Sequence, residues 1–443
     1  MTIAGSDSGG GAGVEADLKT FSALRVFGTC VITAVTAQNT RGVYEIFPVP
    51  PRLVERQIEV VVDDIPVQSV KTGMLYSRET IETVSESIDK YGLRAVVDPV
   101  LRAGTGDALI REKDEEALIR LLVPRAYLLT PNVPEAEVIA GMRIEGLEDM
   151  KEAARKITEL GAEAVVVKGG HLKPEKGEIR DLLYHDGTSK VFKKTHLNVK
   201  PHGGGCVFSA AITAHLARGA GLTDAVEKAE EFMDHSVRHS LSIGSGRAPV
   251  NPMVDLYNNS ERFCVIENVE KAAATIEARR ELLPFIAEVG TQVAMALPYP
   301  SGEEDVAAIE GRIVRLRDRA KAVGSARFGA SRHLARIVLT ATKHCSDMRA
   351  AMNLHCDPKL ADAFKKTGFR VSSFDRASEP SETKSVEGRS LSWGTEQAIR
   401  SFGDVPDMIL DNGEVGKEPM IRVLGRTATE VVGKALKSVR ECL

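Results

Sequence analysis

The sequence predicts an α/β protein with a doubly wound, mostly parallel sheet in its first part and a second, smaller α/β domain behind it. Between residue 1 and about residue 245, short apolar runs alternate with amphipathic stretches. This alternation indicates βαβ units and a parallel sheet covered on both faces. The chain has 443 residues, which is more than one hydrophobic core usually supports. We therefore expect two domains, residues 1–258 and 259–443.

The composition excludes several classes of protein. Apolar residues make up 43% of the chain and charged residues 27%, which rules out a wholly disordered or fibrous protein. The sequence shows no sign of a nucleic-acid-binding surface, since the formal net charge is -4, the aromatic content is 5% and there is no long basic run. We therefore expect small-molecule partners. The six cysteines lack CxxC spacing and no signal peptide is visible, which predicts a reduced, cytoplasmic protein. No apolar run approaches the roughly 20 residues of a membrane-spanning helix.

A glycine-rich loop joins the first predicted strand to the first predicted helix. The stretch TIAGSDSGGGAGVEADLKTFSAL, residues 2–24, opens with a short strand, and its helix places Val14, Leu18, Phe21 and Leu24 on one face. Glycines let the backbone approach a ligand closely, and a helix N-terminus favours anions. The loop matches neither a P-loop nor a dinucleotide-binding loop, so a tight turn without a ligand remains an equal alternative. Because the first strand starts at the first residues, we expect a few further residues upstream.

Three predicted strands end in residues with useful polar chemistry. The runs RAVVDPV (94–100), AYLLTPN (126–132) and AEAVVVKGG (162–170) end in Asp98-Pro99, Pro131-Asn132 and Lys168-Gly169-Gly170. Open α/β sheets bind their ligands outside the carboxyl ends of the strands. We therefore expect a single crevice to collect these residues.

Asn132 and Glu135 lie three residues apart at the start of a predicted helix in TPNVPEAEV. One interpretation is an N-cap whose carboxylate completes a capping box. The other is that Glu135 orders magnesium-bound water near phosphate, since hard cations prefer oxygen ligands. The two roles do not exclude each other.

The stretch PHGGGCVFSAAITAHLARG, residues 201–219, places three glycines and a cysteine at the start of a helix. Gly203, Gly204, Gly205 and Cys206 present free backbone N–H groups there, and such a nest stabilises the negative charge of a transferring phosphoryl group. The same positive end lowers the pKa of a thiol below its free value of roughly 8.5, which predicts that Cys206 serves as a base or polarised thiol. A buried structural cysteine behind a glycine turn is the alternative.

The link between the two domains is predicted at GSGRAPVNPMVDLYNNSERF, residues 244–263, where Gly, Pro and paired Asn occur without periodicity. We place the boundary near residue 258. The following stretch ENVEKAAATIEARRELLPFI has the pattern of an amphipathic helix, and the remainder mixes helices with short strands such as RIVRL and DMILD. This pattern predicts a second α/β domain.

Basic residues gather in the second part of the chain. The stretch VGSARFGASRHLARIVLTATKHCSDMRAAMN, residues 323–353, combines arginines with a Gly-Ala-Ser turn before a helix. Arginine forks bind phosphate bidentately, although an ordinary basic helix face is the alternative. The stretch DNGEVGKEPMIRVLGR, residues 411–426, adds Lys417 and Arg422 in a context that fits either phosphate binding or a polar hairpin. The adjacent His-Cys pairs lack the ligand spacing of a zinc site.

Seven motifs of the first part occur in the order found in hydroxymethylpyrimidine/phosphomethylpyrimidine kinases of the ribokinase-like superfamily, which residues 1–250 resemble. The motifs are TIAGSDSGGGAGVEADLKTF, TAQNT, KTGML, DPV, TPNVPEAE, VKGGH and HGGGCVFSAAI. Residues 265–440, with EVGTQVAMALP, EGRIVRL, RFGASRHLAR, SFDR, WGTEQAI and GKEPMIRVLGR, resemble the synthase domain fused to this kinase in archaeal-type thiamine phosphate synthases. The resemblance implies a bifunctional enzyme of thiamine biosynthesis.

For the first domain, the resemblance implies that ATP phosphorylates the hydroxymethylpyrimidine and then converts the resulting phosphate to the diphosphate. By motif, Asp17 and Gln38 hydrogen-bond the aminopyrimidine, and Met74 packs on its ring. Cys206 occupies the position where sugar kinases of the superfamily carry an aspartate base.

The resemblance also places the ATP phosphates and magnesium. The amides of Gly203 to Gly205 and Cys206 form the anion hole, Asn132 and Glu135 lie near Mg²⁺ and the ATP phosphates, and Lys168 lies near the nucleotide phosphates. The chain departs from the family pattern at Gly204, which replaces a threonine that contacts the nucleotide through its hydroxyl, and at Glu15, where glutamine is commoner.

For the second domain, the resemblance implies that the pyrimidine diphosphate is joined to hydroxyethylthiazole phosphate with release of pyrophosphate. By motif, Arg312 and His333 are the catalytic residues, and Ser331, Lys417 and Arg422 bind phosphate. The family usually carries asparagine where this chain has Gln292.

Two other functions remain as alternatives. The second domain would be a thiamine-phosphate sensor without catalysis, or the first domain would phosphorylate pyridoxal or a similar heterocyclic alcohol. Retention of Arg312 and His333, and the combination of Gln38, Met74 and Cys206, favour the bifunctional enzyme. We also expect a homo-oligomer, because kinases of this superfamily often pair.

Overall fold

The computed structural model describes the chain except for residues 103–105, 108, 111–113, 176, 198, 200, 385–387 and 415–417. The chain divides into two compact units, Met1–Asp255 and Leu256–Leu443. In the described part, no helix is long and apolar enough to cross a membrane.

The first unit is built around a nine-stranded sheet of order β3-β2-β1-β4-β5-β6-β7-β8-β9. Its elements are β1 (Thr2–Asp7), α1 (Gly13–Ala23), β2 (Cys30–Asn39), β3 (Gly42–Pro48), α2 (Pro51–Asp64), β4 (Val70–Thr72), α3 (Arg78–Tyr91), β5 (Ala95–Val97), α4 (Glu115–Ala117), β6 (Ala126–Leu129), α5 (Val133–Ala140), α6 (Leu147–Glu159), β7 (Ala164–Val167), β8 (Glu178–His185), β9 (Thr188–Thr195), β10 (Pro201–His202), α7 (Gly204–Ala217), α8 (Leu222–Arg238) and β11 (Ala248–Pro249). The strands from β2 through β1, β4, β5 and β6 to β7 pair in parallel, while β3, β8 and β9 join antiparallel. The predicted doubly wound, mostly parallel sheet is confirmed.

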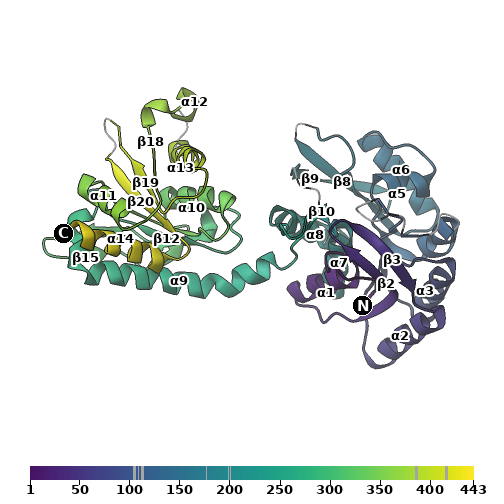
Figure 1. Ribbon diagram of the computed structural model, residues 1–443. Helices are drawn as coiled ribbons and strands as arrows, with labels where there is room; N and C mark the ends of the chain where they lie inside the picture. Colours follow the sequence, from purple (N-terminus) through teal and green to yellow (C-terminus); the bar gives the residue numbers. More distant parts are fainter. Residues whose placement is uncertain are drawn as a thin grey trace. The chain divides into compact units, whose positions relative to one another are not determined.

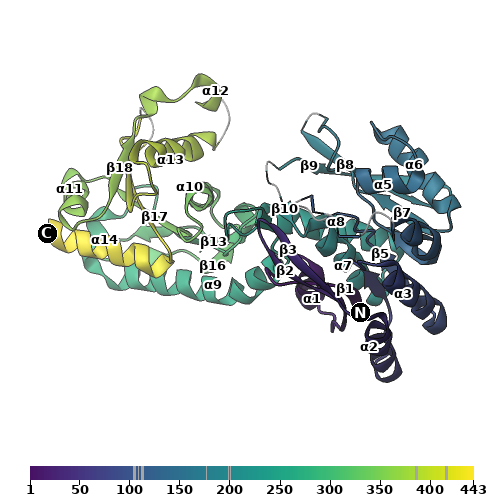
Figure 2. The same ribbon diagram turned by 45° about the vertical axis from the view of Figure 1, so that its right-hand side comes forward.

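Helices cover both faces of this sheet (Figures 1 and 2). One apolar core lies between the sheet and α2, α3, α5 and α6, and a second lies between the sheet and α1, α7 and α8. The three strands with predicted polar ends, β5, β6 and β7, are neighbours in the sheet. Since they are parallel, their carboxyl ends lie at the same edge, where α7 also begins.

The second unit carries a seven-stranded sheet of order β16-β13-β12-β17-β20-β19-β18. Its elements are α9 (Val254–Ala278), β12 (Val293–Ala296), β13 (Val306–Ile309), β14 (Ile313–Arg315), β15 (Ala320–Ala322), β16 (Ala326–Phe328), α10 (Arg332–His344), β17 (Ala350–His355), α11 (Pro358–Lys366), β18 (Val371–Phe374), α12 (Ser381–Lys384), α13 (Arg389–Phe402), β19 (Met408–Asp411), β20 (Met420–Gly425) and α14 (Ala428–Cys442). All its strand pairs are antiparallel except β18 with β19. One core lies between the sheet and α9, α11 and α14, and the other beneath α10 and α13.

The predicted link between the units differs from the structure in its second half. Helix α9 already begins at Val254, inside the stretch interpreted as irregular, and continues to Ala278. The paired asparagines do not interrupt it, because the side chain of Asn258 makes two hydrogen bonds with the backbone of Tyr299, at 2.8 and 3.0 Å. A tertiary contact here outweighs the weak helix propensity of asparagine.

Candidate active sites

The start of α7 is a cradle of uncapped backbone N–H groups. Gly203 is the N-cap, with φ of +79°, and no side chain caps the helix. A Cβ at Gly203 would lie 1.8 Å from the carbonyl oxygen of Gly11, so only glycine lets the two glycine-rich loops touch. The first helical bond runs from the Val207 N–H to the Gly203 carbonyl at 3.0 Å. The preceding amides, up to that of Cys206, are therefore available to an anion.

The ends of β5, β6 and β7 meet beside this cradle, as the sequence predicted. Asp98, which follows β5, accepts a hydrogen bond from the Lys168 ammonium at 3.1 Å, and both side chains are largely buried. Asn132 and Lys168 form a parallel bridge that extends β6 and β7. A Cβ at Gly205 would lie 3.3 Å from Asp98 Oδ2 and 3.3 Å from Lys168 Nζ. The Lys168 ammonium and the Asp98 carboxylate thus lie together beside Gly205, at the N-terminus of α7.

Asn132 and Glu135 form the capping box that one interpretation predicted. The Glu135 N–H donates to Asn132 Oδ1 at 3.0 Å, and the Asn132 N–H donates to Glu135 Oε2 at 2.9 Å. Burial raises the pKa of the Glu135 carboxyl to about 7, against the opposing effect of Lys168. A carboxyl with this pKa can hold or release a proton near neutral pH.

The glycine-rich loop after β1 is organised by the carboxylate of Asp7. Its two oxygens accept hydrogen bonds from the N–H groups of Gly9 at 2.8 Å, Gly11 at 3.0 Å and Ala12 at 2.8 Å. Gln38 lies beside this loop, and its backbone exchanges two hydrogen bonds with the Ser8 hydroxyl, at 2.8 and 2.9 Å. These hydrogen bonds therefore hold the loop in one conformation beside Gln38.

Met74 lies on an apolar patch near the same end of the sheet. Its side chain is buried with Ala34 and Leu109. A Cβ at Gly5 would lie 3.1 Å from its sulfur, so the strand β1 passes close to it. A polarisable thioether in this place suits contact with a flat ring.

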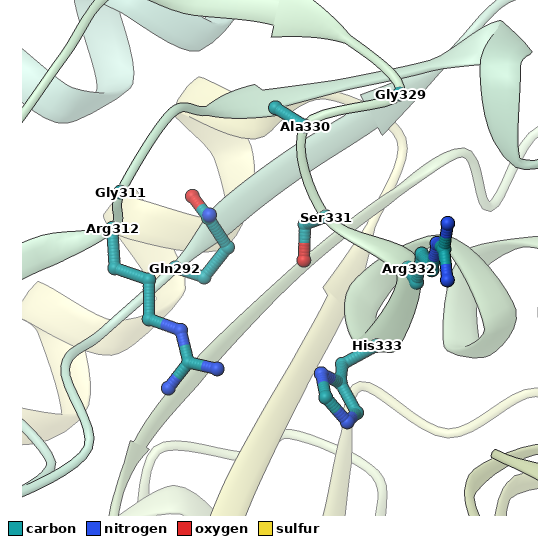
Figure 3. A pocket seen from close by; sticks show the side chains of 8 residues that line it. All are labelled: Gln292, Gly311, Arg312, Gly329, Ala330, Ser331, Arg332 and His333. Atoms are coloured by element: carbon teal, nitrogen blue, oxygen red, sulfur yellow. The ribbon is translucent and has the colours of Figure 1, made fainter. Parts of the chain in front are cut away.

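In the second unit, one pocket of about 400 Å³ is lined by residues from three loops and the first turn of α10 (Figure 3). Its lining residues are Gln292, Gly311, Arg312, Gly329, Ala330, Ser331, Arg332 and His333. The side chains of Arg312, Ser331 and His333 surround the same hollow, whereas the Arg332 side chain points away from it (Figure 3). Three residues predicted from two separate motifs are thus brought together.

The local backbone explains how Arg312 and His333 reach this pocket. Arg312 adopts φ of +71°, an unusual value for a residue with a side chain, and follows Gly311 at +73°. Such strain is retained where surrounding structure holds it, and it is common at functional sites. Ser331 caps α10 by accepting a hydrogen bond from the Leu334 N–H at 3.4 Å, which places His333 in the first turn of the helix.

Comparison with known proteins assigns both units. Residues 7–251 match the phosphomethylpyrimidine kinase family, and residues 268–437 match the thiamine-phosphate synthase ThiN family. Over 98% of its length the chain is 37% identical to the bifunctional thiamine biosynthesis protein ThiDN of Methanocaldococcus jannaschii, of which it covers 96%. The chain belongs to this bifunctional family. Its first unit is a kinase domain and its second a thiamine phosphate synthase domain, as the sequence motifs predicted.

Single-domain relatives and solved structures match the kinase domain. A hydroxymethylpyrimidine/phosphomethylpyrimidine kinase of Bacillus subtilis is 47% identical over 57% of this chain and 93% of its own length. The ADP complex of Bacillus subtilis pyridoxal kinase is 36% identical with a TM-score of 0.53, covering 57% of this chain and 96% of that one. Pyridoxal kinase from Staphylococcus aureus, in complex with AMP-PCP and pyridoxal, is 33% identical with a TM-score of 0.52, covering 57% of this chain and 91% of that one. These similarities confirm the ribokinase-like fold of the kinase domain.

The expected low pKa of Cys206 is wrong. Burial raises the pKa of its thiol to about 11, and the nearby carboxylates of Asp17 and Asp98 add to this, against the opposing effects of Lys71 and the Gly13 amide. The helix N-terminus that the sequence revealed is real, but desolvation outweighs it. Cys206 is therefore a neutral thiol at neutral pH in the unliganded kinase domain.

The predicted contact between Asp17 and the pyrimidine is also corrected. The Asp17 carboxylate is fully buried, accepts a hydrogen bond from the Thr2 hydroxyl at 2.6 Å and pairs with the equally buried Lys71 ammonium at 2.8 Å. Burial by itself lowers the pKa of Lys71, but the Asp17 carboxylate outweighs it and holds that pKa above its ordinary value. In this structure the Asp17 carboxylate therefore pairs with Lys71 in the core and is not exposed to a ligand.

We expect this buried pair to be essential for the stability of the kinase domain. Lys71→Met leaves the Asp17 carboxylate uncompensated in the core, which should lower the free energy of unfolding by about 3–5 kcal/mol. Thermal and urea unfolding followed by circular dichroism measure the loss. As a control, Arg78→Ala removes the exposed ion pair with Glu82 and should cost at most about 1 kcal/mol. Equal losses in the two variants would contradict the assignment.

One predicted phosphate ligand of the synthase domain, Arg422, is not among the residues that line the pocket. Arg422 is only 4% exposed and forms ion pairs with the buried Asp411, which also accepts two hydrogen bonds from Arg376, at 2.8 and 2.7 Å. Burial lowers the pKa of Arg422 to about 10. In this structure its buried guanidinium pairs with Asp411 of the neighbouring strand. Lys417 lies outside the described residues.

Several site residues were not found from the sequence. The sequence motifs include Lys71, Asp7 and His202, but nothing in the motifs predicted a function for these residues. A lysine inside the apolar strand Val70–Thr72 was the available signal, because a buried ammonium requires a buried carboxylate. Nothing in the sequence indicated that His202 lies beside Asp7, because 195 residues separate them.

Proposed function

We propose that the kinase domain transfers phosphate from ATP first to the hydroxyl of hydroxymethylpyrimidine and then to the resulting phosphate. The synthase domain then joins the diphosphate to hydroxyethylthiazole phosphate and releases pyrophosphate. The observation that carries the kinase assignment is the convergence of the α7 N-terminus with Asp98 and Lys168. Phosphoryl transfer needs positioning and charge stabilisation more than covalent chemistry, and this arrangement supplies both.

In this proposal each group has a defined task. The amides from Gly203 to Cys206 bind the transferring phosphoryl group, because N–H groups at a helix N-terminus without a side-chain cap attract an anion. Lys168 binds the nucleotide phosphates, Gln38 and Met74 hold the pyrimidine, and the Cys206 sulfur takes the proton of the attacking hydroxyl. The thiol must lose its own proton first, so the base is scarce below its pKa of about 11.

Magnesium would enter with the nucleotide. In the described part of the chain, no three His, Cys, Asp or Glu side chains are placed to hold a metal ion. Mg²⁺ at ATP is usually bound by one or two carboxylates, waters and substrate phosphates, and Glu135 with Asn132 fits this smaller requirement. The metal would neutralise phosphate charge, while Glu135 would hold one of its waters.

Lys168→Met should raise the KM for ATP and lower kcat, together reducing kcat/KM by about ten- to a hundredfold, the usual range for a lost hydrogen bond to a charged group. Initial rates of ADP formation at varied ATP test this. The matched control is Lys228→Met, because Lys228 lies on α8 and pairs with the exposed Asp224 at 2.8 Å. An unchanged KM for ATP in the Lys168 variant would remove Lys168 from the nucleotide site.

The synthase assignment is supported by the pocket that Arg312, Ser331 and His333 share. The reaction must neutralise a leaving diphosphate and aim the thiazole nitrogen at the pyrimidine methylene. We assign Arg312 to the diphosphate, His333 to proton donation toward the leaving group, and Ser331 to phosphate binding at the N-terminus of α10. A sensor without catalysis would not need both a strained arginine and a histidine facing one cavity.

Pyridoxal is a second candidate substrate of the kinase domain, because solved pyridoxal kinases share its fold with TM-scores of 0.53 and 0.52. Competition between pyridoxal and hydroxymethylpyrimidine in one assay decides between them. We propose hydroxymethylpyrimidine as the preferred substrate, since the synthase domain on the same chain consumes its diphosphate.

We further propose that the protein works in the cytoplasm as a homo-oligomer. The edge strand β3 carries Tyr44 and Phe47, which are 67% and 69% exposed. Large aromatic side chains at an unpaired sheet edge suit association with a second copy.

A further inference from the structure

Gln38 is held at the end of β2 by an irregular strand and by the glycine-rich loop. The register of β2 with β3 shifts between Ala37 and Gln38, and such a bulge re-aims the side chains beside it. The Ser8 hydroxyl then fixes the Gln38 backbone. The Gln38 side chain lies partly exposed, between the buried side chains of His202 and Thr36. Its backbone is therefore fixed, and the neighbouring side chains decide which way its amide points.

His202 must carry its proton on Nε2. Burial alone would raise the pKa of Asp7, but the His202 side chain and the loop amides hold that pKa below its ordinary value. Asp7 is therefore a carboxylate that only accepts hydrogen bonds, and its Oδ2 lies 3.2 Å from His202 Nε2. Nδ1 of His202 is buried and has no hydrogen-bond partner among the described residues, so a proton on Nδ1 would have no acceptor there. The arrangement with a hydrogen on Nε2 is the one that gives Asp7 a donor.

Thr36 must act as an acceptor toward Gln38. Its hydroxyl donates its one hydrogen to the Ser6 carbonyl at 2.8 Å. The amide of Gln38 has Nε2 placed 3.4 Å from His202 Nε2 and Oε1 placed 3.3 Å from Thr36 Oγ1. That order sets a donor against a donor and an acceptor against an acceptor. The two ends of a carboxamide have nearly the same shape. Exchanging them lets the Gln38 nitrogen donate to Thr36 Oγ1 and lets the Gln38 oxygen accept from the His202 Nε2–H, which it shares with Asp7 in a three-centre hydrogen bond.

We propose that Asp7, His202 and Thr36 are positioning residues that fix the Gln38 carboxamide with its oxygen toward His202 and its nitrogen toward Thr36. The oxygen then keeps one free lone pair and the nitrogen one free N–H, in a fixed order. This inference rests on the proposed role of Gln38 in binding the pyrimidine. An aminopyrimidine edge carries a ring nitrogen that accepts and an amino group that donates, the pattern that glutamine binds bidentately in adenine.

The fixed order gives the kinase domain a means of selecting its substrate. The amino group donates to the Gln38 oxygen while the ring nitrogen accepts from the amide N–H. A heterocyclic alcohol with an aldehyde or hydrogen in place of the amino group cannot donate to that oxygen. Sites that hydrogen-bond a substrate group discriminate strongly against analogues lacking it, because a polar group is then left unpaired.

The test compares hydroxymethylpyrimidine with its analogue bearing hydrogen in place of the amino group, using the full chain. His202→Phe keeps an aromatic ring but removes the N–H. It should raise the KM for hydroxymethylpyrimidine about three- to tenfold and the KM for the analogue by a smaller factor. The ratio of the two kcat/KM values should therefore fall. His202→Gln retains a donor near the Nε2 position and should restore most of the ratio. Thr36→Val removes the acceptor and should lower the ratio as His202→Phe does.

The outcomes separate this inference from the proposed function beneath it. If Gln38→Ala leaves the KM for hydroxymethylpyrimidine unchanged, Gln38 does not bind the substrate and the proposed pyrimidine site fails. If Gln38→Ala raises this KM while His202→Phe and Thr36→Val leave the ratio unchanged, the positioning role fails alone. Equal losses with both substrates, or a parallel rise in the KM for ATP, would show a merely structural role and overturn the inference.

Discussion

Cys206→Ala is expected to lower the turnover of the kinase domain by about a hundredfold or more, while thiamine phosphate formation from supplied pyrimidine diphosphate continues. The physical reason is that a positioned general base usually contributes about 10²–10⁴-fold. The position of Cys206, beside free amides at the start of α7, suits a group that takes a proton from a hydroxyl as the phosphoryl group is transferred. Formation of ADP and of the diphosphate measures the effect.

The pH dependence tests the same assignment. Because the pKa of the Cys206 thiol is raised to about 11, the thiolate fraction increases about tenfold for each pH unit in the range below it. The kinase turnover of the wild type should therefore rise with pH between neutral pH and pH 9 or so. In Cys206→Ala this rise should be absent, because the titrating group is gone.

Cys206→Ser separates a base from a group that only fills space or donates a hydrogen bond. Serine keeps the shape and the hydrogen-bonding capacity, but its hydroxyl ionises far less readily than a thiol. If the thiolate is the base, Cys206→Ser should be nearly as slow as Cys206→Ala. The assignment would be wrong if Cys206→Ser turned over as fast as the wild type, or if the kinase turnover of the wild type did not change with pH.

The kinase fold and the general place of its site follow from the sequence because they depend on local patterns. Apolar runs that end in Asp98, Asn132 and Lys168 specify buried parallel strands, and parallel strands bring their carboxyl ends together. The glycine cap at Gly203 likewise predicts an uncapped helix N-terminus. For the synthase domain, the motifs placed Arg312, Ser331 and His333, which do share a pocket.

What could not be predicted depends on depth and on distant partners. The sequence shows that Cys206 starts a helix but not how much protein surrounds its sulfur, and burial decides its pKa. Asp17 has the pattern of a surface helix residue, yet Lys71, 54 positions away, makes it a core residue. Arg422 was identified as a basic residue near a glycine turn, but in the folded sheet its guanidinium pairs with the buried carboxylate of Asp411 on the neighbouring strand. These outcomes are set by tertiary contacts, which no short stretch of the sequence records.

His333→Ala is expected to block the second half of the reaction sequence and to leave the first intact. In the presence of ATP, magnesium, hydroxymethylpyrimidine and thiazole phosphate, the diphosphate should accumulate and thiamine phosphate formation should fall by about 10²–10³-fold, the usual effect of losing one group that stabilises developing charge. Arg312→Ala should behave in the same way, because its guanidinium faces the same pocket (Figure 3). Chromatography of the pyrimidine products measures both intermediates and product.

The chain offers a matched control at the other end of the same helix. His344 closes α10 and pairs with Glu396 at 2.8 Å, outside the pocket lining. His344→Ala removes an equal imidazole from α10 without changing the cavity, so its synthase rate should stay within about twofold of the wild type, as for surface substitutions in general. If both histidine variants lost activity equally, destabilisation of α10 would explain the loss, and a catalytic role of His333 would not be supported. If His333→Ala kept full activity, the leaving diphosphate would have to be stabilised by Arg312 and backbone amides alone.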